Sequence, residues 1–254
     1  MKKNLSILSI ITIVIIAMTT GCKKSSSPQT LFSGDTKSLG TGNMRSWVKT
    51  DGNGKAVSVG FTINAAAIAS LPARDTMIML MLPMNTSGSM MNMTMAMPFD
   101  HIEVDWSAMG DTMSSIFNHP HLDCHFFTIS SSAQMNIMMG MDTVMMGASY
   151  VPGNCMGDGI AEAGMGTHWY DTTLSIYHGS AFNQTYMYGF YQGNMTFVEV
   201  MCAKTYLDTK PTFSGNISQP SSFKTSGYYP MKYTVSYDAT ANEYTYSLDN
   251  LMAH

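Results

Sequence analysis

The chain has 254 residues, of which 45% are hydrophobic, 11% aromatic and only 12% charged. A globular protein carries about 25% charged residues, yet the mean hydropathy near zero excludes a disordered polyelectrolyte. Thirteen basic and 17 acidic residues give a net charge of −4, so we expect no nucleic-acid partner, because phosphate binding needs a basic surplus. The length is sufficient for a compact domain that buries its own core.

The first segment is typical of an export signal. Lys2 and Lys3 precede an apolar run from Leu5 to Met18, which is too short to cross a bilayer but matches the core of a signal peptide. The run is followed by Thr-Thr-Gly-Cys, which resembles a bacterial lipobox and predicts that Cys22 receives a lipid. A Thr replaces the usual Leu three positions before this Cys, so an ordinary signal peptide is the alternative. We expect a membrane-anchored protein of the bacterial cell envelope, facing the periplasm or the exterior.

The rest of the chain is expected to form a tether and one domain. We assign residues 1–21 to the lipoprotein signal peptide, residues 22–40 to a polar tether and residues 41–254 to a single β-rich domain. No segment after the signal reaches 18 consecutive apolar residues, so no further membrane span is expected.

Most of this domain follows the two-residue period of half-buried strands. Strands are predicted at 45–49, 55–63, 77–82, 99–106, 119–129, 185–191, 195–203, 233–237 and 243–248. The run 64–71 predicts a short helix with Asn64 as its N-cap and Pro72 at its end, and further helices are expected at 131–140 and 203–208. These elements favour a mainly β fold, a single antiparallel barrel- or sandwich-like domain with a few short helices.

Polar and apolar residues alternate along two of these strands, so each strand has one polar face. The polar faces carry His101, Glu103, Asp105, His119, His121, Asp123 and His125. The opposite faces carry Ile102, Val104, Leu122, Cys124 and Phe126, which we expect in the core. Imidazole and carboxylate groups ~6.6 Å apart can converge on one divalent metal ion, such as zinc, iron, manganese or copper. A solvated sheet face without a metal is the alternative.

Two later residues can join this group. His168 follows Gly-Met-Gly-Thr, a turn in which the backbone can approach a ligand closely. Glu199 is a lone carboxylate in the apolar strand 195–203, where burial would require a partner for its charge, and a surface position is the alternative. We expect His121, His125 and at least one of His168, His101 or Glu199 to converge within ~5 Å, as metal bonds of ~2.0–2.2 Å require. Asp123 is as suited to orient a ligand as to bind the ion.

Sulfur-containing residues leave two questions open. The chain has 27 Met, whose soft thioethers favour Cu(I), but Met is also a flexible core residue. The segment 84–97 places Met at every second position from Met91 onward, as on one face of a strand. Cys124, Cys155 and Cys202 form no C-x-x-C pair, and both a Cys155–Cys202 disulfide and three free thiols are compatible with the sequence.

Five motifs in order resemble a known family. They lie at 98–103, 120–127, 151–153, 165–168 and 188–199. The set resembles a small bacterial family of uncharacterised exported proteins, typified by a Thermus protein under extracytoplasmic sigma-factor control, over about residues 97–205. The resemblance implies a ring-forming homo-oligomer of unknown function. Its polar motif positions correspond here to His101, Glu103, His121, Asp123, His125, His168 and Glu199. The chain departs from the family at Asp111, where a His is typical, and at Val200, where a Pro is typical.

Together these features predict an exported, lipid-anchored envelope protein with a His/carboxylate metal site. Its role is not fixed by the sequence, and three functions are compatible with it. A metal ion with all its coordination positions filled by protein ligands would favour a metal-binding protein. An open coordination position would favour a metal-dependent, hydrolase-like enzyme. A filled, hydrogen-bonded face would favour a structural ring former without metal.

Overall fold

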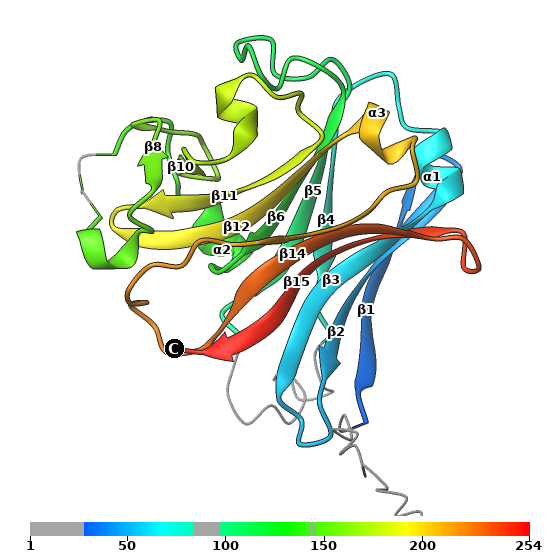
Figure 1. Ribbon diagram of the computed structural model, residues 1–254, viewed down its shortest axis with the longest axis horizontal. Coiled ribbons are helices and arrows are strands. Elements are labelled where there is room, and N and C mark those ends of the chain that lie inside the picture. Colours follow the sequence, from blue (N-terminus) through cyan, green and yellow to red (C-terminus); the bar gives the residue numbers. More distant parts are fainter. Residues whose placement is uncertain (1–27, 84–96, 143, 145) are drawn as a thin grey trace, which may run out of the picture.

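The computed structural model describes residues 28–83, 97–142, 144 and 146–254, and these form two antiparallel sheets packed face to face (Figure 1). The first sheet has the order β1-β2-β3-β15-β14-β13, with β1 (Thr30–Leu39), β2 (Gly42–Thr50), β3 (Ala56–Asn64), β13 (Thr212–Asn216), β14 (Tyr228–Asp238) and β15 (Glu243–Ala253). The second has the order β4-β5-β6-β12-β11-β10-β8, with β4 (Thr76–Met81), β5 (His101–Ser107), β6 (His121–Phe127), β8 (Cys155–Gly157), β10 (Thr167–Asp171), β11 (Gln184–Tyr191) and β12 (Asn194–Ala203). A small third sheet pairs β7 (Gly140–Met141) with β9 (Ile160–Ala161). Of the two predicted architectures, the described residues adopt the sandwich.

Local sequence explains the hairpins and the first helix. The β2–β3 turn is closed by the Asp51 carboxylate, which accepts hydrogen bonds from the backbone N–H of Asn53 and of Lys55 at 2.9 and 3.0 Å. In α1 (Ala65–Ala69), the side chain of Asn64 accepts from the N–H of Ala67 at 3.0 Å, as predicted for an N-cap.

The other helices are short. They are α2 (Ser131–Gln134), α3 (Lys204–Leu207) and the 3₁₀ turns η1 (Ala148–Tyr150) and η2 (Ser175–His178). The predicted helix at 131–140 is therefore limited to one turn, and its last predicted residue, Gly140, begins β7.

Residues Thr30–Leu39, which the sequence assigned to the tether, form the strand β1. This strand lies at the edge of the first sheet and is mostly exposed on both faces, so it lacks the alternation by which a strand is recognised. The expected signal peptide, Cys22 and the Met-rich residues 84–96 lie outside the described residues. Within the described ranges, the structure contains no helix that is long and apolar enough to cross a membrane.

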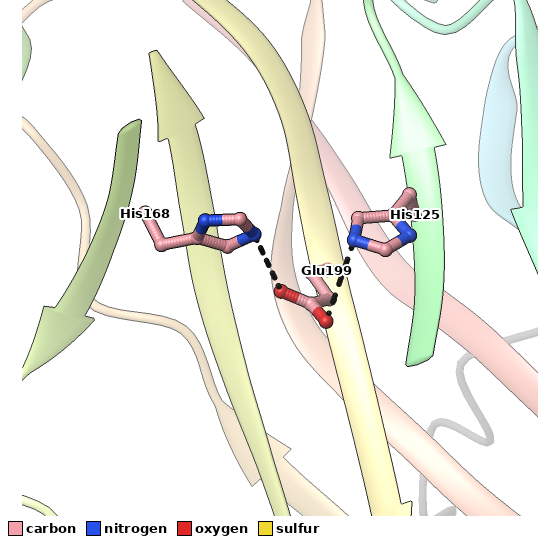
Figure 2. Close-up of side chains that lie close together, drawn as sticks. All are labelled: His125, His168 and Glu199. Atoms are coloured by element: carbon pink, nitrogen blue, oxygen red, sulfur yellow. Dashed lines mark ion pairs between the residues drawn. The ribbon is translucent and has the colours of Figure 1, made fainter. Parts of the chain in front are cut away.

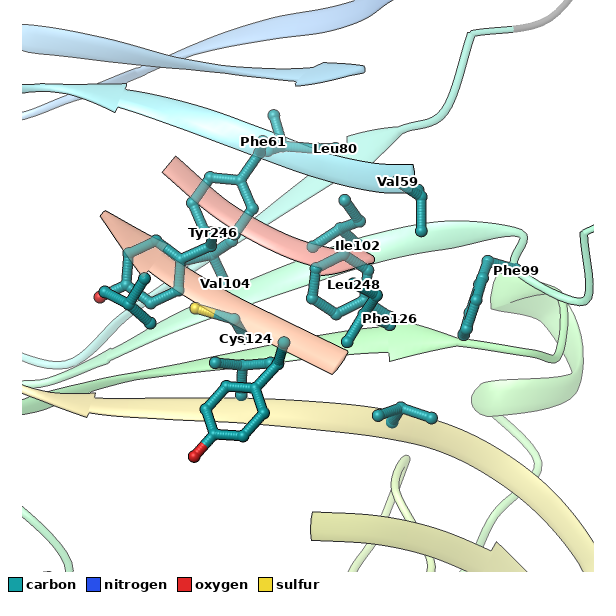
Figure 3. Packing of buried hydrophobic residues seen from close by; sticks show 14 of the residues in the cluster. Val59, Phe61, Leu80, Phe99, Ile102, Val104, Cys124, Phe126, Tyr246 and Leu248 are labelled. Atoms are coloured by element: carbon teal, nitrogen blue, oxygen red, sulfur yellow. The ribbon is translucent and has the colours of Figure 1, made fainter. Parts of the chain in front are cut away.

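The core lies between the two sheets (Figure 3). The five predicted core residues of β5 and β6, Ile102, Val104, Leu122, Cys124 and Phe126, are at most 2% exposed, which confirms the assignment of the two faces. The first sheet contributes Phe61 and Tyr246, whose rings stack at 5.0 Å between centroids. All three cysteines of the described chain are free, with Cys124 and Cys202 buried. The opposite face of β5 and β6 therefore points away from this core and carries the polar residues.

Candidate metal centre

Strand register brings the polar residues together on the outer face of the second sheet. Glu103 of β5 pairs with His125 of β6, which pairs with Glu199 of β12. Neighbouring strands lie ~4.8 Å apart, so residues paired in this way have adjacent side chains on the same face. The three residues form one row across three strands.

Figure 2 shows the carboxylate of Glu199 between the imidazoles of His125 and His168. Nε2 of His125 is 3.5 Å from one Glu199 oxygen, and Nε2 of His168 is 3.8 Å from the other. Two ligand atoms bound at ~2.1 Å to a tetrahedral ion are ~3.4 Å apart. The spacing is thus longer than that of a good hydrogen bond and close to that of two ligands on one ion. One ligand atom from each residue fits within 4.8 Å of the others.

Burial leaves one oxygen of this carboxylate without a partner. His125 and Glu199 are each 2% exposed, whereas the His168 side chain is 15% exposed. The Glu199 oxygen that faces His168 has no hydrogen-bond partner among the described residues. An unpaired buried carboxylate oxygen is unfavourable, and a cation between the three residues would satisfy it.

The ionisable groups differ in the direction of their pKa shifts. Burial raises the pKa of Glu199 to about 8, against the opposing effect of the His125 charge. Burial by itself would lower the pKa of His125, but the carboxylates of Glu199 and Asp105 raise it to about 10. Burial and the His125 charge lower the pKa of His168 to about 3, so this imidazole is neutral at pH 7. Neutral imidazole is the form that binds metals, and His168 can bind without losing a proton.

The second ring nitrogen of each histidine faces further carboxylates. Nδ1 of His125 is 3.2 Å from Asp105, and Nδ1 of His168 is 3.7 Å from Glu162 and 3.9 Å from Asp158. Metal-bound imidazoles usually have a carboxylate or carbonyl near the second nitrogen, and both histidines have a carboxylate there, although none of these contacts has the geometry of a hydrogen bond.

An aromatic ring packs against both histidines. The Phe197 ring lies 4.8 Å from the His125 ring and 5.3 Å from the His168 ring, measured between centroids. It lies over Gly189, where a Cβ atom would be only 2.2 Å from the ring. His168 pairs with Gly189 and Gly189 with Phe197, so glycine at this register position lets His168 reach diagonally to Glu199.

His101 and Glu103 belong to a hydrogen-bonded group beside the centre. The side-chain amide of Gln134 donates to Glu103 at 3.0 Å, and its oxygen is 3.1 Å from Nε2 of His101. The other His101 nitrogen is 2.9 Å from Asp100. Both ring nitrogens of His101 therefore have polar partners. We call a set of residues a metal-sized group where their ligand atoms lie within 4.8 Å of one another. Among the described residues His101 belongs to no such group, whereas Glu103 forms one with Asp105 and His125.

His121 lies apart from His125, in contrast to the convergence expected from the sequence. Its Nε2 is 3.1 Å from Asp123, and its Nδ1 is 2.5 Å from the carbonyl oxygen of His119. Residues four apart on a strand are ~13 Å apart, so neighbours on adjacent strands approach His125 more closely than His121 does. Asp123 contacts His121 and is also outside the metal-sized groups of the described chain. Whether either residue takes part in metal binding stays a prediction.

Two carboxylates near the centre were missed from the sequence. Asp158 and Glu162 form a third metal-sized group with His168, but Gly157-Asp158-Gly159 has the pattern of an ordinary turn. Only the pairing of β8 with β10 brings Asp158 near His168, and no local signal indicates it. Asp111, which takes the place of a family His, accepts from the N–H of Met113 in an exposed turn and is not among the grouped residues of the described ranges.

Comparison with known families identifies one similarity. Searches of curated proteins and of solved structures gave no match. Residues 51–106 match the family model described as TTHB210-like, Hypothetical protein TTHB210. The match runs from the β2–β3 turn to Trp106 of β5, includes His101, Glu103 and Asp105, and overlaps the motifs of 97–205 only at its end. Over residues 51–106, the chain is therefore similar to this family of uncharacterised proteins.

Proposed function

We propose that this protein is an envelope metal-binding protein that holds a divalent cation between His125, His168 and Glu199. The observation that carries the proposal is the convergence of three ligand atoms from three strands around a buried, unpartnered carboxylate oxygen. Two imidazoles and one carboxylate suit zinc, iron, manganese or copper, and the donor set itself selects none of them. The lipid anchor at Cys22, the envelope location and the ring-shaped homo-oligomer are part of the proposal on sequence grounds.

A metal-dependent hydrolase-like enzyme is the second candidate. Three protein ligands leave one position of a tetrahedral ion open, as in catalytic zinc sites. The His168 side chain is 15% exposed, so solvent can approach the ion from this side. Water in the open position would become a nucleophile near neutral pH. A structural role without metal is the remaining alternative.

Elemental analysis of the natively exported, full-length protein tests the proposal. The key variant is His168→Ala, which removes the most accessible ligand. The matched control is His178→Ala, because His178 is exposed on η2 and its Nε2 is 2.7 Å from the Thr172 carbonyl oxygen. We expect at least one tightly held metal ion in wild type and control, and one ion fewer in His168→Ala. Equal metal content in all three proteins would refute the site.

A hydrolysis assay separates the two candidates. Metal-dependent cleavage of a chromogenic ester or phosphoester that is lost in His168→Ala and kept in His178→Ala would favour the enzyme. Full metal content without such cleavage would favour a binding protein.

A further inference from the structure

The two nitrogens of His125 face two different ligand groups. Nε2 points to Glu199 and His168, and Nδ1 is 3.2 Å from Oδ2 of Asp105. Glu103, Asp105 and His125 also offer ligand atoms that lie within 4.8 Å of one another. This second group lies on β5 and β6, on the side of His125 away from His168.

The contact between His125 and Asp105 does not satisfy either atom. Nδ1 of His125 and Oδ2 of Asp105 are both buried, and neither forms a hydrogen bond of good geometry within the described chain. Leaving buried polar atoms unsatisfied is destabilising. A separation of 3.2 Å is also that of two ligands held at ~2.1 Å by one cation. A cation would therefore satisfy both atoms where a hydrogen bond does not.

Glu103 is held in place to complete this group. It is 3% exposed, and the Gln134 amide donates to its Oε2 at 3.0 Å. Its other oxygen is free of that bond and can bind a cation. A hydrogen bond to one carboxylate oxygen is the usual means by which a ligating carboxylate is oriented. Gln134 belongs to α2, which covers this end of the polar face.

Solvent reaches Asp105 of the second group by its own route. The Asp105 side chain is 23% exposed and lines a surface hollow of about 360 Å³ together with Asp75 and Asp123. Three carboxylates at a hollow attract cations. A cation can therefore reach Asp105 without passing His168.

We propose that a second divalent cation binds Glu103, Asp105 and Nδ1 of His125, so that His125 bridges two cations as an imidazolate. The inference rests on the proposed function, because His125 is shared by both positions. Three carboxylates and one imidazolate carry four negative charges, which balance two divalent cations. The Nε2 proton of His125 and the proton of Glu199 leave to solvent as the first cation binds, and the Nδ1 proton of His125 leaves as the second cation binds. The centre is thus a dinuclear site with one nitrogen-rich and one oxygen-rich position.

Copper(II) is the probe that tests this, because two copper spins joined by an imidazolate couple and lose the single-ion electron paramagnetic resonance signal. The full-length protein is loaded with copper(II), and loosely held metal is removed with glycine. We expect two copper ions and a coupled signal in wild type, and one ion with an ordinary single-ion signal in Glu103→Gln. Glu243→Gln is the matched control, because Glu243 lies on β15 of the first sheet, and it should behave as wild type. Asp105→Asn serves as a second variant if Glu103→Gln does not fold.

The outcomes separate the two proposals. One copper ion in both wild type and Glu103→Gln would overturn the second position and leave the first intact. Two copper ions with uncoupled spins in wild type would overturn the bridge. No retained copper in wild type would overturn both the second position and the proposed function.

Discussion

Gly189→Ala should weaken both the fold and the metal centre. The new methyl group would be 2.2 Å from the Phe197 ring. Gly189 lies in β11 beside a register shift and does not have a positive φ, so the contact itself is the problem. Phe197 is fully buried and its ring packs against those of His125 and His168, so a shift of this ring would disturb both histidines. Overpacking of this kind costs about 1–3 kcal/mol, which for a domain of this size lowers Tm by roughly 2–12 °C.

Urea unfolding of the metal-free protein measures the loss of stability, and a metal titration measures the loss of affinity. Gly153→Ala is the matched control, because no heavy atom of the described residues lies within 4 Å of its added Cβ. Adding Phe197→Leu to Gly189→Ala should restore part of the lost stability, since it removes the atoms in conflict. The reasoning is wrong if Gly189→Ala matches Gly153→Ala in both assays.

Two further predictions concern the core and the export signal. Phe126→Ala should lower the free energy of unfolding by about 3–5 kcal/mol, because Phe126 is fully buried between the sheets, and urea unfolding measures it. A loss below 1 kcal/mol would contradict the packing described. Metabolic labelling with palmitate should mark the wild type and not Cys22→Ser, and equal labelling of both would refute the lipid anchor.

The sequence predicts which face of a strand each residue lies on better than it predicts which strands lie side by side. Alternation places Ile102 and Cys124 in the core and His125 on the opposite face, because the two-residue period is a local property of the chain. The approach of His168 to Glu199 depends on the order β12-β11-β10, which no local pattern encodes. The sequence could therefore name both residues as candidates without showing that they meet.

The same limit explains why His121 was expected beside His125. Two histidines four residues apart on one face look like a pair in the sequence, but along a strand they are far apart. Asp105 and Glu199, which are distant in sequence, contact His125 from the strands on either side. In an antiparallel sheet, the row across the strands brings ligands together, and the strand itself only decides which face they share.

Stability should depend on pH in opposite directions with and without metal. The pKa values of His125 and Glu199 are raised from 6.5 and 4.5 to about 10 and 8, so the metal-free folded protein binds protons that the unfolded chain has released. Its stability is therefore lost as pH rises through this window, by up to about 1.4 kcal/mol per pH unit for each such proton. The pKa of His168 is lowered from 6.5 to about 3, so His168 makes the folded state more stable as pH rises from about 3 to 6.5. Above pH 6.5 this contribution to stability no longer changes with pH.

Between pH 7 and 8.5, the metal-free protein should thus lose thermal stability as pH rises. The metal-loaded protein should keep or gain stability, because bound ligands are already deprotonated and metal binding releases protons. Calorimetric scans in chelator and in excess zinc, at half-unit pH steps, measure both curves. A metal-free Tm that rises over this window, or two curves that run parallel, would mean that His125 and Glu199 do not hold their protons in competition with a metal ion. A difference that widens with pH is the signature of one buried pair that exchanges protons for a cation.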